Sequence, residues 1–364
     1  MPGLVRVIAG VVVGMVVVTA CGGGGREEGG PLVVGTTSGS DPDGVLDLGA
    51  GEEVAGGIEV PWGLAFLPDG TGLVAERNSG VVLRVSPGKA PERVYEVPGV
   101  VAQGEGGLLG LAVSPRYEED RFVYAYFTGA EDNRIVRFRT DGPPEVIFAG
   151  IAKAGNHNGG RIAFGPDGML YAGTGDAGRS DRSQDPASPN GKILRLTPEG
   201  RPAPDNPTPD SPVYSLGHRN VQGLAWDTKG RLYAAEFGQN RFDEINRIEP
   251  GHNYGWPTVE GTGDTDRGRY TNPLLTWTTR EASPSGIAIT ADTLYTAALR
   301  GECLWATPLH DGTLGTPQPR LRDRGRLRTV EVAPDGALWV TTSNTDGRGD
   351  PHPGDDRILR FPAH

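Results

Sequence analysis

Short apolar runs separated by tight turns recur along the chain. The clearest unit begins with an apolar segment that ends in Leu-Pro-Asp-Gly at residues 64–70, and apolar segments follow at 73–76 and 81–85. In such a turn Pro and Asp preset the backbone, and Gly accepts a positive φ. The unit therefore predicts a strand, a turn, a second strand, a loop and a third strand.

The same unit occurs six times, with first strands near residues 64, 111, 162, 224, 287 and 330. The mean spacing, from residue 64 to residue 330 over five intervals, is about 53 residues, which is typical of propeller blades with insertions. No segment shows sustained helical periodicity. The sequence therefore predicts an all-β, six-bladed β-propeller with four-stranded blades, in which the outer strand of each blade is weakly marked.

The first 57 residues have a different character. Arg6 precedes an apolar run, residues 7–18, that is too short to span a bilayer comfortably, and Val-Thr-Ala-Cys21 follows. This ending resembles a bacterial lipobox and implies a signal peptide over residues 1–21 with lipid attached to Cys21. An ordinary cleaved signal peptide is the alternative.

The organisation that follows places the chain outside the cell. Residues 22–57 are rich in Gly, Ser and Asp and predict a flexible tether, so the domain is expected at 58–364. The protein would then lie on the extracellular face of the membrane, held only by its lipid, or be secreted. With Cys21 lipidated, Cys303 has no disulfide partner and is expected to be a buried thiol.

Composition narrows the possible partners. The 57 Gly and 31 Pro residues argue against long helices and favour short strands with tight turns. The formal net charge of −11 argues against a nucleic-acid partner, which would need a broad basic surface. Acidity is also compatible with cation binding, although that requires particular carboxylates and carbonyls.

The phase of the repeats places polar residues at one end of the predicted channel. In a propeller blade, residues just before the first strand and just after the second meet at the same mouth. The residues in these positions include Glu105, His157, Asp176, Arg219, Asn220, Arg300, Arg326 and Arg328. Loops are polar in general, but four arginines at one mouth of an acidic chain favour an anionic ligand.

Five motifs that occur in order within residues 60–361 carry a family resemblance. They are Gly104-Glu-Gly-Gly-Leu-Leu-Gly110, His157-Asn-Gly-Gly-Arg-Ile162, Leu216-Gly-His-Arg-Asn-Val-Gln-Gly223, Asp243-Glu-Ile-Asn246 and Asn253-Tyr-Gly-Trp-Pro257. Together they resemble the soluble sugar dehydrogenases that use pyrroloquinoline quinone (PQQ). The resemblance implies oxidation of an aldose at its anomeric carbon to the lactone, with PQQ and Ca²⁺ as cofactors and an unidentified electron acceptor.

The resemblance assigns the catalytic pair. His157 matches the base of the family, and an imidazole with a pKa near neutrality suits removal of a hydroxyl proton. Asp176 lies at the matching position of the same blade, where it could orient His157 and stabilise its charge. The alternatives are a polar loop histidine bonded to its neighbours and an aspartate that stabilises a turn.

The resemblance also implies a cationic cradle for the three carboxylates of PQQ. Arg219 and Asn220 match residues near the quinone oxygens, and Arg326 with Arg328 matches a pair that contacts the carboxylates. The remaining cofactor contacts are expected at Glu105, His157, Trp277, which would stack on the planar ring system, and Arg300. Taken singly, each arginine could equally be a surface or ion-pair residue.

Calcium is implied at two places. Carbonyl groups of Gly238 and Gln239 match the site that bridges PQQ and the protein, and Glu244 with Tyr254 matches a second site of the aldose-type members. A strand-edge salt bridge at Glu244 and core packing of Tyr254 are the alternatives.

Two departures from the family bear on the substrate. Glu105 stands where the glucose enzymes have Gln, and Phe237 replaces a polar residue, so a broader range of aldoses is expected.

Two other functions are compatible with the architecture, because a fold does not determine a function. One is a non-catalytic propeller that binds a ligand or a protein, and the other is a calcium-dependent lactone hydrolase. The presence of His157 and Asp176 together with the arginine set favours the dehydrogenase over a binding module. Hydrolase sites hold calcium among several carboxylates, whereas this mouth is rich in arginine.

Overall fold

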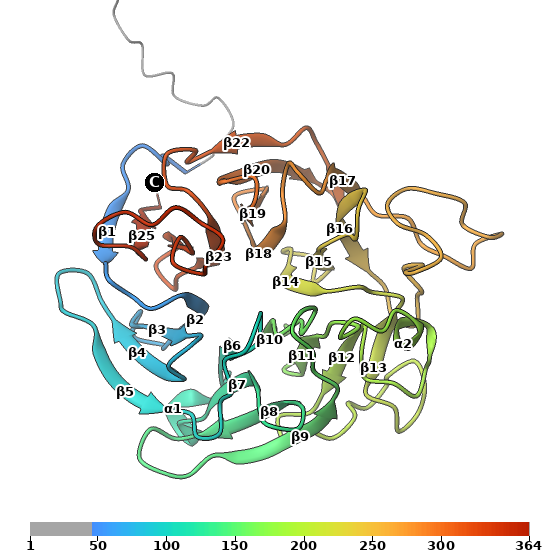
Figure 1. The fold of residues 1–364 in the computed structure, drawn as a ribbon, viewed down its shortest axis with the longest axis horizontal. Coiled ribbons are helices and arrows are strands. Elements are labelled where there is room, and N and C mark those ends of the chain that lie inside the picture. The colour runs from blue at the N-terminus through green and yellow to red at the C-terminus, as the bar shows by residue number, and fades with distance from the viewer. Residues whose placement is uncertain (1–45, 364) are drawn as a thin grey trace, which may run out of the picture. The chain divides into compact units, whose positions relative to one another are not determined.

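The computed structural model describes residues 46–363, which form six antiparallel sheets arranged in a ring (Figure 1). Cys21, the predicted signal peptide and most of the predicted tether lie outside the described residues. Two short helices, α1 (Tyr117–Asp120) and α2 (Asp181–Gln184), lie in loops, and no helix within 46–363 is long and apolar enough to cross a membrane. The six-bladed propeller predicted from the repeats is confirmed.

In blades one to five the strands run in sequence order from the ring axis outward, and in blade six the outermost strand is β1. Blade one contains β2 (Pro61–Phe66), β3 (Gly72–Glu76), β4 (Val81–Val85) and β5 (Glu92–Glu96). Blade two contains β6 (Leu108–Val113), β7 (Val123–Thr128), β8 (Asn133–Phe138) and β9 (Glu145–Ile151). Blade three contains β10 (Ile162–Phe164), β11 (Leu170–Gly173), β12 (Lys192–Leu196) and β13 (Val213–Leu216).

The second half of the ring repeats this order. Blade four contains β14 (Val221–Trp226), β15 (Leu232–Glu236), β16 (Phe242–Ile248) and β17 (Leu275–Thr278). Blade five contains β18 (Pro284–Thr290), β19 (Thr293–Ala298) and β20 (Cys303–His310), with β21 (Thr313–Leu314) and β22 (Gln318–Arg320) both paired to β20. Blade six contains β23 (Leu327–Val332), β24 (Leu338–Thr342), β25 (Ile358–Phe361) and, from the other end of the domain, β1 (Glu52–Ala55).

Blade six closes the ring because its outer strand comes from the start of the domain. Glu52 lies opposite Arg360 in an antiparallel pair, and the two side chains form an ion pair at 2.7 Å. Leu46 is also buried, in a core cluster with residues of blades five and six. The predicted boundary at residue 58 is therefore too late, and the end of the predicted tether is part of the propeller.

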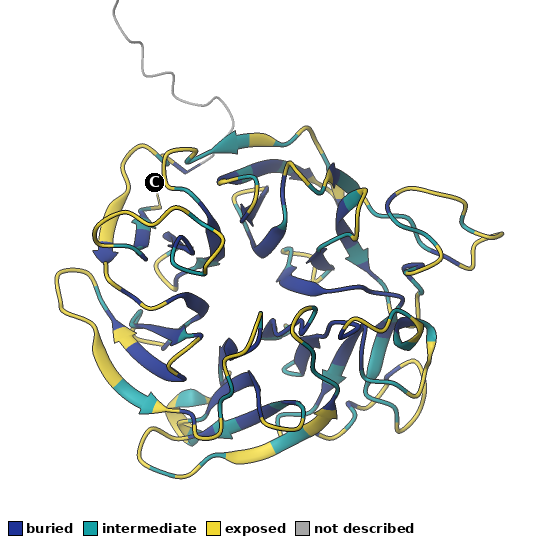
Figure 2. Cartoon of the chain, in the orientation of Figure 1, coloured by how far each residue is buried: buried dark blue, intermediate teal, exposed yellow. Residues whose placement is uncertain are grey.

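Apolar side chains fill the space between neighbouring blades, and exposure is concentrated on loops and outer strands (Figure 2). The cluster between blades one and two joins residues of β3, such as Leu73, to residues of β6 and β7, such as Leu111 and Val123. Cys303 is buried and unpaired, as predicted, and burial raises the pKa of its thiol to about 11. Contacts with its neighbours therefore stabilise each blade in addition to the pairing within its own sheet.

Glycines on the innermost strands let neighbouring blades come close together around the axis. A Cβ atom on Gly110 would lie 2.2 Å from the carbonyl oxygen of Gly160, and one on Gly223 would lie 2.4 Å from that of Ser285. Both obstructing atoms belong to the backbone of the next blade, so no side-chain rotation can make room. The tight centre of the ring therefore requires glycine at these positions.

We expect Gly110→Ala to lower the free energy of unfolding by about 1–3 kcal/mol, because the added methyl group must push apart two backbones. Gly142→Ala is the matched control, since a Cβ atom added there would meet no atom within 4 Å and the φ of Gly142 is not positive. Chemical denaturation monitored by tryptophan fluorescence measures both. Equal stability of the two variants would contradict this account of the ring.

Candidate active site

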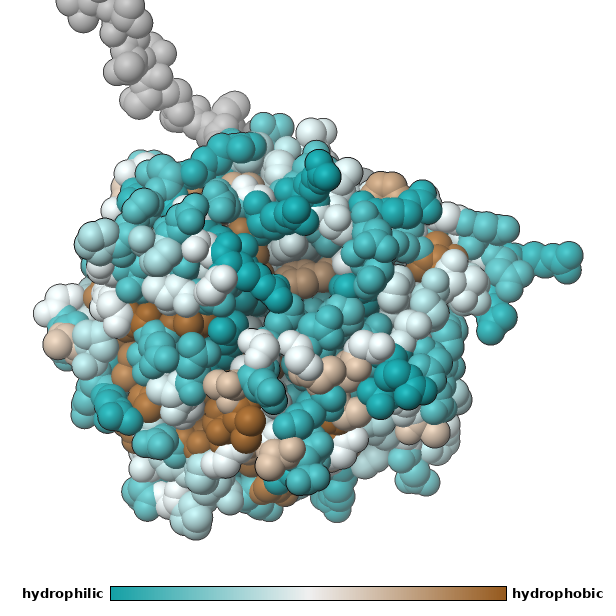
Figure 3. Space-filling model, viewed as in Figure 1, coloured by the Kyte–Doolittle hydropathy of each residue, from teal (hydrophilic) through white to brown (hydrophobic). Residues whose placement is uncertain are grey.

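One mouth of the ring gathers polar side chains from several blades. On the face drawn in Figure 3, hydrophilic residues surround a hollow at the centre of the ring. The loops that carry His157 and Asp176 are bound to each other and to the next blade: the amide of Ala177 donates to the carbonyl of His157 at 3.1 Å, and the amide of Asp176 donates to that of Arg219 at 2.9 Å. The interlocked loops hold these three residues close together.

The imidazole of His157 is bonded at both nitrogens. Its Nδ1 lies 2.7 Å from Oδ1 of Asp176, and its Nε2 lies 2.7 Å from a terminal nitrogen of Arg219. A guanidinium group has only donors, so Nε2 must accept, and Nδ1 must carry the proton donated to Asp176. The contacts therefore select a neutral imidazole with its lone pair on Nε2, a form that can act as a base.

Asp176 is held as a carboxylate. Its side chain is only 2% exposed, and burial opposes ionisation, but hydrogen bonds from His157, from Nε1 of Trp256 (2.9 Å) and from the amide of Gly178 (2.8 Å) keep its pKa below the ordinary value. Trp256 belongs to the Asn-Tyr-Gly-Trp-Pro motif, yet the motif alone gave it no role. Its position beside Asp176 follows from a contact between blades three and four that the sequence does not reveal.

Arg219 is buried beside His157 and held from its other side by the loop that follows β15. Its Nε and a terminal nitrogen donate to Oε1 of Gln239 at 2.9 and 2.7 Å, and a further nitrogen donates to the carbonyl of Phe237 at 3.0 Å. Burial lowers its pKa, against the opposing charges of four carboxylates, the nearest in effect being Asp176. The arginine remains the cation of the site, fixed in one orientation.

Two predicted cofactor contacts have buried nitrogens without a partner among the described residues. Oδ1 of Asn220 accepts from the amide of Gly159 at 2.9 Å, but its Nδ2 has no acceptor. Arg328 donates to Oε1 of Gln222 at 2.9 Å, while its Nε has none. Buried polar groups are seldom left unpaired, so both nitrogens are available to acceptor atoms of a ligand or of water at this mouth.

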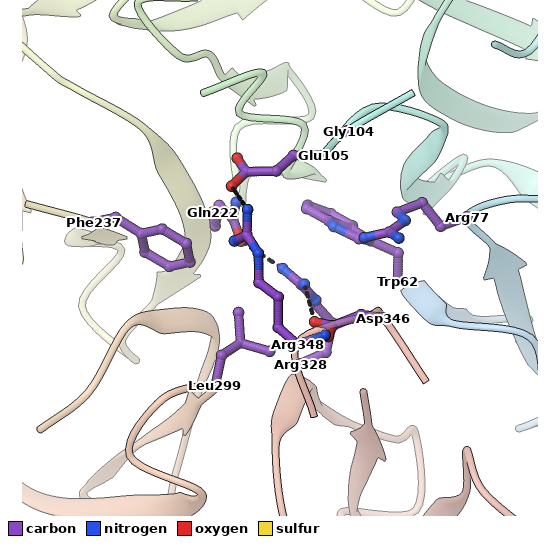
Figure 4. A pocket seen from close by; sticks show the side chains of 10 residues that line it. All are labelled: Trp62, Arg77, Gly104, Glu105, Gln222, Phe237, Leu299, Arg328, Asp346 and Arg348. Atoms are coloured by element: carbon purple, nitrogen blue, oxygen red, sulfur yellow. Dashed lines mark hydrogen bonds and ion pairs between the residues drawn. The ribbon is translucent and has the colours of Figure 1, made fainter. Parts of the chain in front are cut away.

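Arginines also line the adjacent pocket, to which blades one, two, four, five and six all contribute residues (Figure 4). Its lining consists of Trp62, Arg77, Gly104, Glu105, Gln222, Phe237, Leu299, Arg328, Asp346 and Arg348. Arg348 pairs with Glu105 at 2.9 Å, and Asp346 pairs with Arg326 at 2.8 Å. Burial lowers the pKa of Arg77, and it lowers that of Arg328 to about 9, so an anionic ligand would relieve the cost of these buried charges.

Several residues of this pocket were missed from sequence. Arg77 directly follows the second strand of blade one, so the rule that placed Asp176 at the mouth could have found it. Asp346 and Arg348 lie in the loop over residues 343–357, after the second strand of blade six. The same rule places this loop at the mouth, but it does not say which of its side chains point into the pocket. Trp62 sits on the innermost strand β2, and its ring lies 4.5 Å from the guanidinium carbon of Arg161.

Of the predicted cofactor contacts, Glu105 and Arg328 line this pocket, and Arg326 reaches it through its ion pair with Asp346. His157, Arg219 and Asn220 lie in the adjoining cluster, whereas Trp277 and Arg300 belong to neither group.

Trp277 is on β17, the outermost strand of blade four, and its ring packs 5.7 Å from that of Trp305. Three strands separate it from the axis, so the expected stacking on a ligand at the mouth does not fit its position. Arg300 is exposed after β19, and Leu299 lines the pocket at that point instead.

Three of the four predicted calcium residues, all but Gln239, line a second, smaller pocket that Arg219 also borders. Gly238, Glu244 and Tyr254 border it with two further carboxylates, Glu236 and Glu260. Burial, followed by the charge of Glu236, raises the pKa of Glu244 to about 8. The hydroxyl of Tyr254 is engaged by backbone groups and donates to the carbonyl of Arg247 at 2.6 Å.

The carboxylate oxygens of this pocket are of the type that a hard cation binds, but the described residues contain no group of three His, Cys, Asp or Glu in an arrangement that could hold a metal ion. Glu236 and Glu244 face each other across β15 and β16, and a cation would balance their buried charge. Oε1 of Gln239 is already occupied by Arg219, so Gln239 has its backbone carbonyl to offer.

Replacing Asp176 with Asn should destabilise the protein by about 1–3 kcal/mol at pH 7, because the three donors that face this side chain then meet one acceptor oxygen instead of two. The pKa of Asp176 is lowered in the folded protein, so its stabilising contribution is complete above its ordinary value of 3.8 and is lost as the pH falls through the folded value. Unfolding curves of both proteins should therefore differ fully at pH 7 and converge only below about pH 4. A difference that vanishes already at pH 6 would contradict the assignment.

The chain is similar to sugar dehydrogenases of known structure. A PQQ-bound aldose sugar dehydrogenase from Streptomyces coelicolor is 54% identical with a TM-score of 0.82, over 85% of this chain and 96% of that one. A putative oxidoreductase (glucose dehydrogenase) of Thermus thermophilus is 48% identical with a TM-score of 0.80, over 85% and 99%. Aldose sugar dehydrogenase YliI of Escherichia coli is 28% identical over 336 residues, which cover 80% of this chain and 89% of that protein.

The match to a family extends over nearly the whole ring. Residues 58–359 match the family described as glucose/sorbosone dehydrogenase. This range covers all strands from β2 to β24 and both pockets described above. The chain therefore belongs to the glucose/sorbosone dehydrogenase family of oxidoreductases, as the five motifs indicated.

Proposed function

We propose that the protein oxidises aldose sugars at the anomeric carbon, with PQQ as the electron acceptor in the site and His157 as the base. The single observation that carries the proposal is the pair of contacts made by His157, whose Nδ1 lies 2.7 Å from Asp176 and whose Nε2 lies 2.7 Å from Arg219, because these partners leave the lone pair on Nε2. Support for the cofactor comes from the unpaired nitrogens of Asn220 and Arg328 and from the PQQ-bound relative that is 54% identical.

His157 and Asp176 have separate roles in the proposed proton transfer. His157 takes the proton of the anomeric hydroxyl at Nε2, in place of the bond that it accepts from Arg219. Asp176 accepts from Nδ1 throughout and stabilises the imidazolium that forms. When bound, PQQ would accept the hydride that leaves the sugar carbon.

The cradle for the cofactor combines charge with unsatisfied donors. Arg77, Arg326 and Arg328 offer guanidinium groups to the carboxylates, and Asn220 offers its free Nδ2. Trp62, whose position at the pocket suits contact with a planar group, replaces Trp277 in this account.

We further propose that calcium binds at the carbonyl groups of Gly238 and Gln239, and at Glu244 in the smaller pocket. The observation in favour is the pair of buried carboxylates, Glu236 and Glu244, whose mutual repulsion a divalent cation would relieve. A bound calcium ion would act as a Lewis acid and raise the electrophilicity of the cofactor.

The proposal predicts that the purified protein reduces an artificial electron-accepting dye with aldoses only when both PQQ and Ca²⁺ are supplied. His157→Ala should lower kcat by about 100-fold or more, because the base is lost while the cradle remains. Initial rates over a panel of aldoses measure the effect, and Glu281→Ala, which alters a carboxylate that caps a local turn in blade four, is the control.

The outcomes separate the competing functions. Full activity in His157→Ala would remove the assigned base. Activity without added Ca²⁺ that survives EDTA would contradict the calcium site. Hydrolysis of lactones without PQQ, or PQQ binding without dye reduction, would replace the dehydrogenase with a hydrolase or a binding propeller.

The N-terminal sequence supports a second proposal, that lipid on Cys21 holds the protein at the extracellular face of the membrane. In bacterial cells grown with an alkyne-tagged fatty acid, the wild-type protein should carry the tag and sediment with membranes. Cys21→Ser should lose the tag and the membrane association together. Labelling that persists in the variant would overturn the anchor.

A further inference from the structure

Glu260 makes an unusual set of contacts next to the active-site mouth. Its Oε1 accepts hydrogen bonds from four consecutive backbone amides, those of residues 239, 240, 241 and 242, at 2.8, 2.9, 2.9 and 3.2 Å. The carboxylate is half-buried, and although burial opposes its ionisation, the four amides keep its pKa below the ordinary value. Four successive amides of the loop after β15 therefore converge on one carboxylate oxygen.

The backbone of this loop is tightly packed at Gly238. A Cβ atom on Gly238 would lie 1.7 Å from the carbonyl oxygen of Phe242 and 2.9 Å from Oε1 of Glu260. The amide of Gly238 donates to Oδ1 of Asp243 at 2.9 Å, so the loop is held at its start as well as along its length. Because the amides of 239–242 all point to Glu260, the path of the chain through the loop is fixed by that side chain.

The same loop holds Arg219. Oε1 of Gln239 accepts from two nitrogens of Arg219, at 2.9 and 2.7 Å, and the carbonyl of Phe237 accepts from the third, at 3.0 Å. The nitrogen at 2.7 Å from Gln239 also lies 2.7 Å from Nε2 of His157. A continuous series of contacts therefore joins Glu260 to the imidazole.

We infer that Glu260 is a positioning residue for the active site: by organising the 237–242 loop it fixes the guanidinium of Arg219 against Nε2 of His157. The catalytic meaning of this inference rests on the proposed function, whereas the geometric part does not. Glu260 follows the Trp256 that holds Asp176, so one turn over residues 255–261 supports both partners of His157. That turn also binds Glu244, whose Oε1 accepts from the amide of Gly261 at 2.7 Å.

The inference is tested in the ligand-free protein by hydrogen exchange of the Nε–H group of Arg219, observed by ¹⁵N NMR and assigned by its loss in Arg219→Lys. Glu260→Ala should accelerate this exchange by at least about ten-fold, because Gln239 no longer holds the guanidinium in one place. Glu260→Gln keeps a carbonyl oxygen for the amides and should stay within about two-fold of the wild type. Glu281→Ala, which removes a carboxylate that caps only its own turn, is the control and should also leave the exchange rate within about two-fold of the wild type.

A second variant guards against loss of the fold. Glu260→Asp retains the charge but withdraws the oxygen by one methylene group, and it should also accelerate the exchange. Exchange of the Arg219 group that is unchanged in both Glu260→Ala and Glu260→Asp overturns the inference. Exchange that is accelerated as much in Glu260→Gln as in Glu260→Ala also overturns the inference, because Gln keeps the oxygen that the loop amides need and should preserve the position of Arg219.

Dye reduction provides the catalytic readout. With PQQ and Ca²⁺ present, Glu260→Ala should lower kcat by about ten-fold and leave the KM for the aldose within about two-fold, because Glu260 itself does not touch the sugar. Dye reduction that is absent from every protein, with the exchange effect intact, would refute the proposed function and leave the positioning role standing. Wild-type kcat in Glu260→Ala would refute the catalytic part of the inference.

Discussion

The contact between the guanidinium of Arg219 and Nε2 of His157 is the interaction on which the rest of the site depends. Because arginine can only donate, this contact decides where the proton of the imidazole lies, and Asp176 completes the choice at Nδ1. Burying the arginine is costly, and the carboxylates around it reduce that cost. The mouth is thus an arrangement in which charges of both signs hold one histidine in its basic form.

The propeller supplies what such an arrangement needs. His157, Asp176 and Arg219 come from loops of blades three and four, which lie so close that a Cβ atom on Gly173 of blade three would lie 2.6 Å from a side-chain carbon of Val221 of blade four. Closure of the ring by β1 and β25 keeps the blades from separating. A site assembled from loops is therefore held by a rigid frame, which fixes both hydrogen bonds of His157 at 2.7 Å.

The blades and the three residues around His157 could be predicted from the sequence, because each repeat shows where its strands begin and end. Once the Pro-Asp-Gly turns marked the strands, the order of strands in a blade put His157, Asp176 and Arg219 at one mouth. The rule failed where pairing depends on distant residues. Residues 52–55 have no strong apolar pattern and become a strand only because β25 pairs with them. Trp277 was assigned as a cofactor contact from the family resemblance, but its large ring packs beside Trp305 in the core cluster of blades four and five. The role of Glu260 was equally invisible, since it arises from backbone amides that any residue carries.

The most direct test of the account is the tautomer of His157 in the ligand-free protein at neutral pH, read from the ¹⁵N chemical shifts of its ring in histidine-labelled protein. The account predicts a neutral ring with the proton on Nδ1 and none on Nε2, and a loss of that signal in His157→Ala. A proton on Nε2, or a ring protonated at both nitrogens, would contradict it, because Arg219 could then not lie where the structure places it.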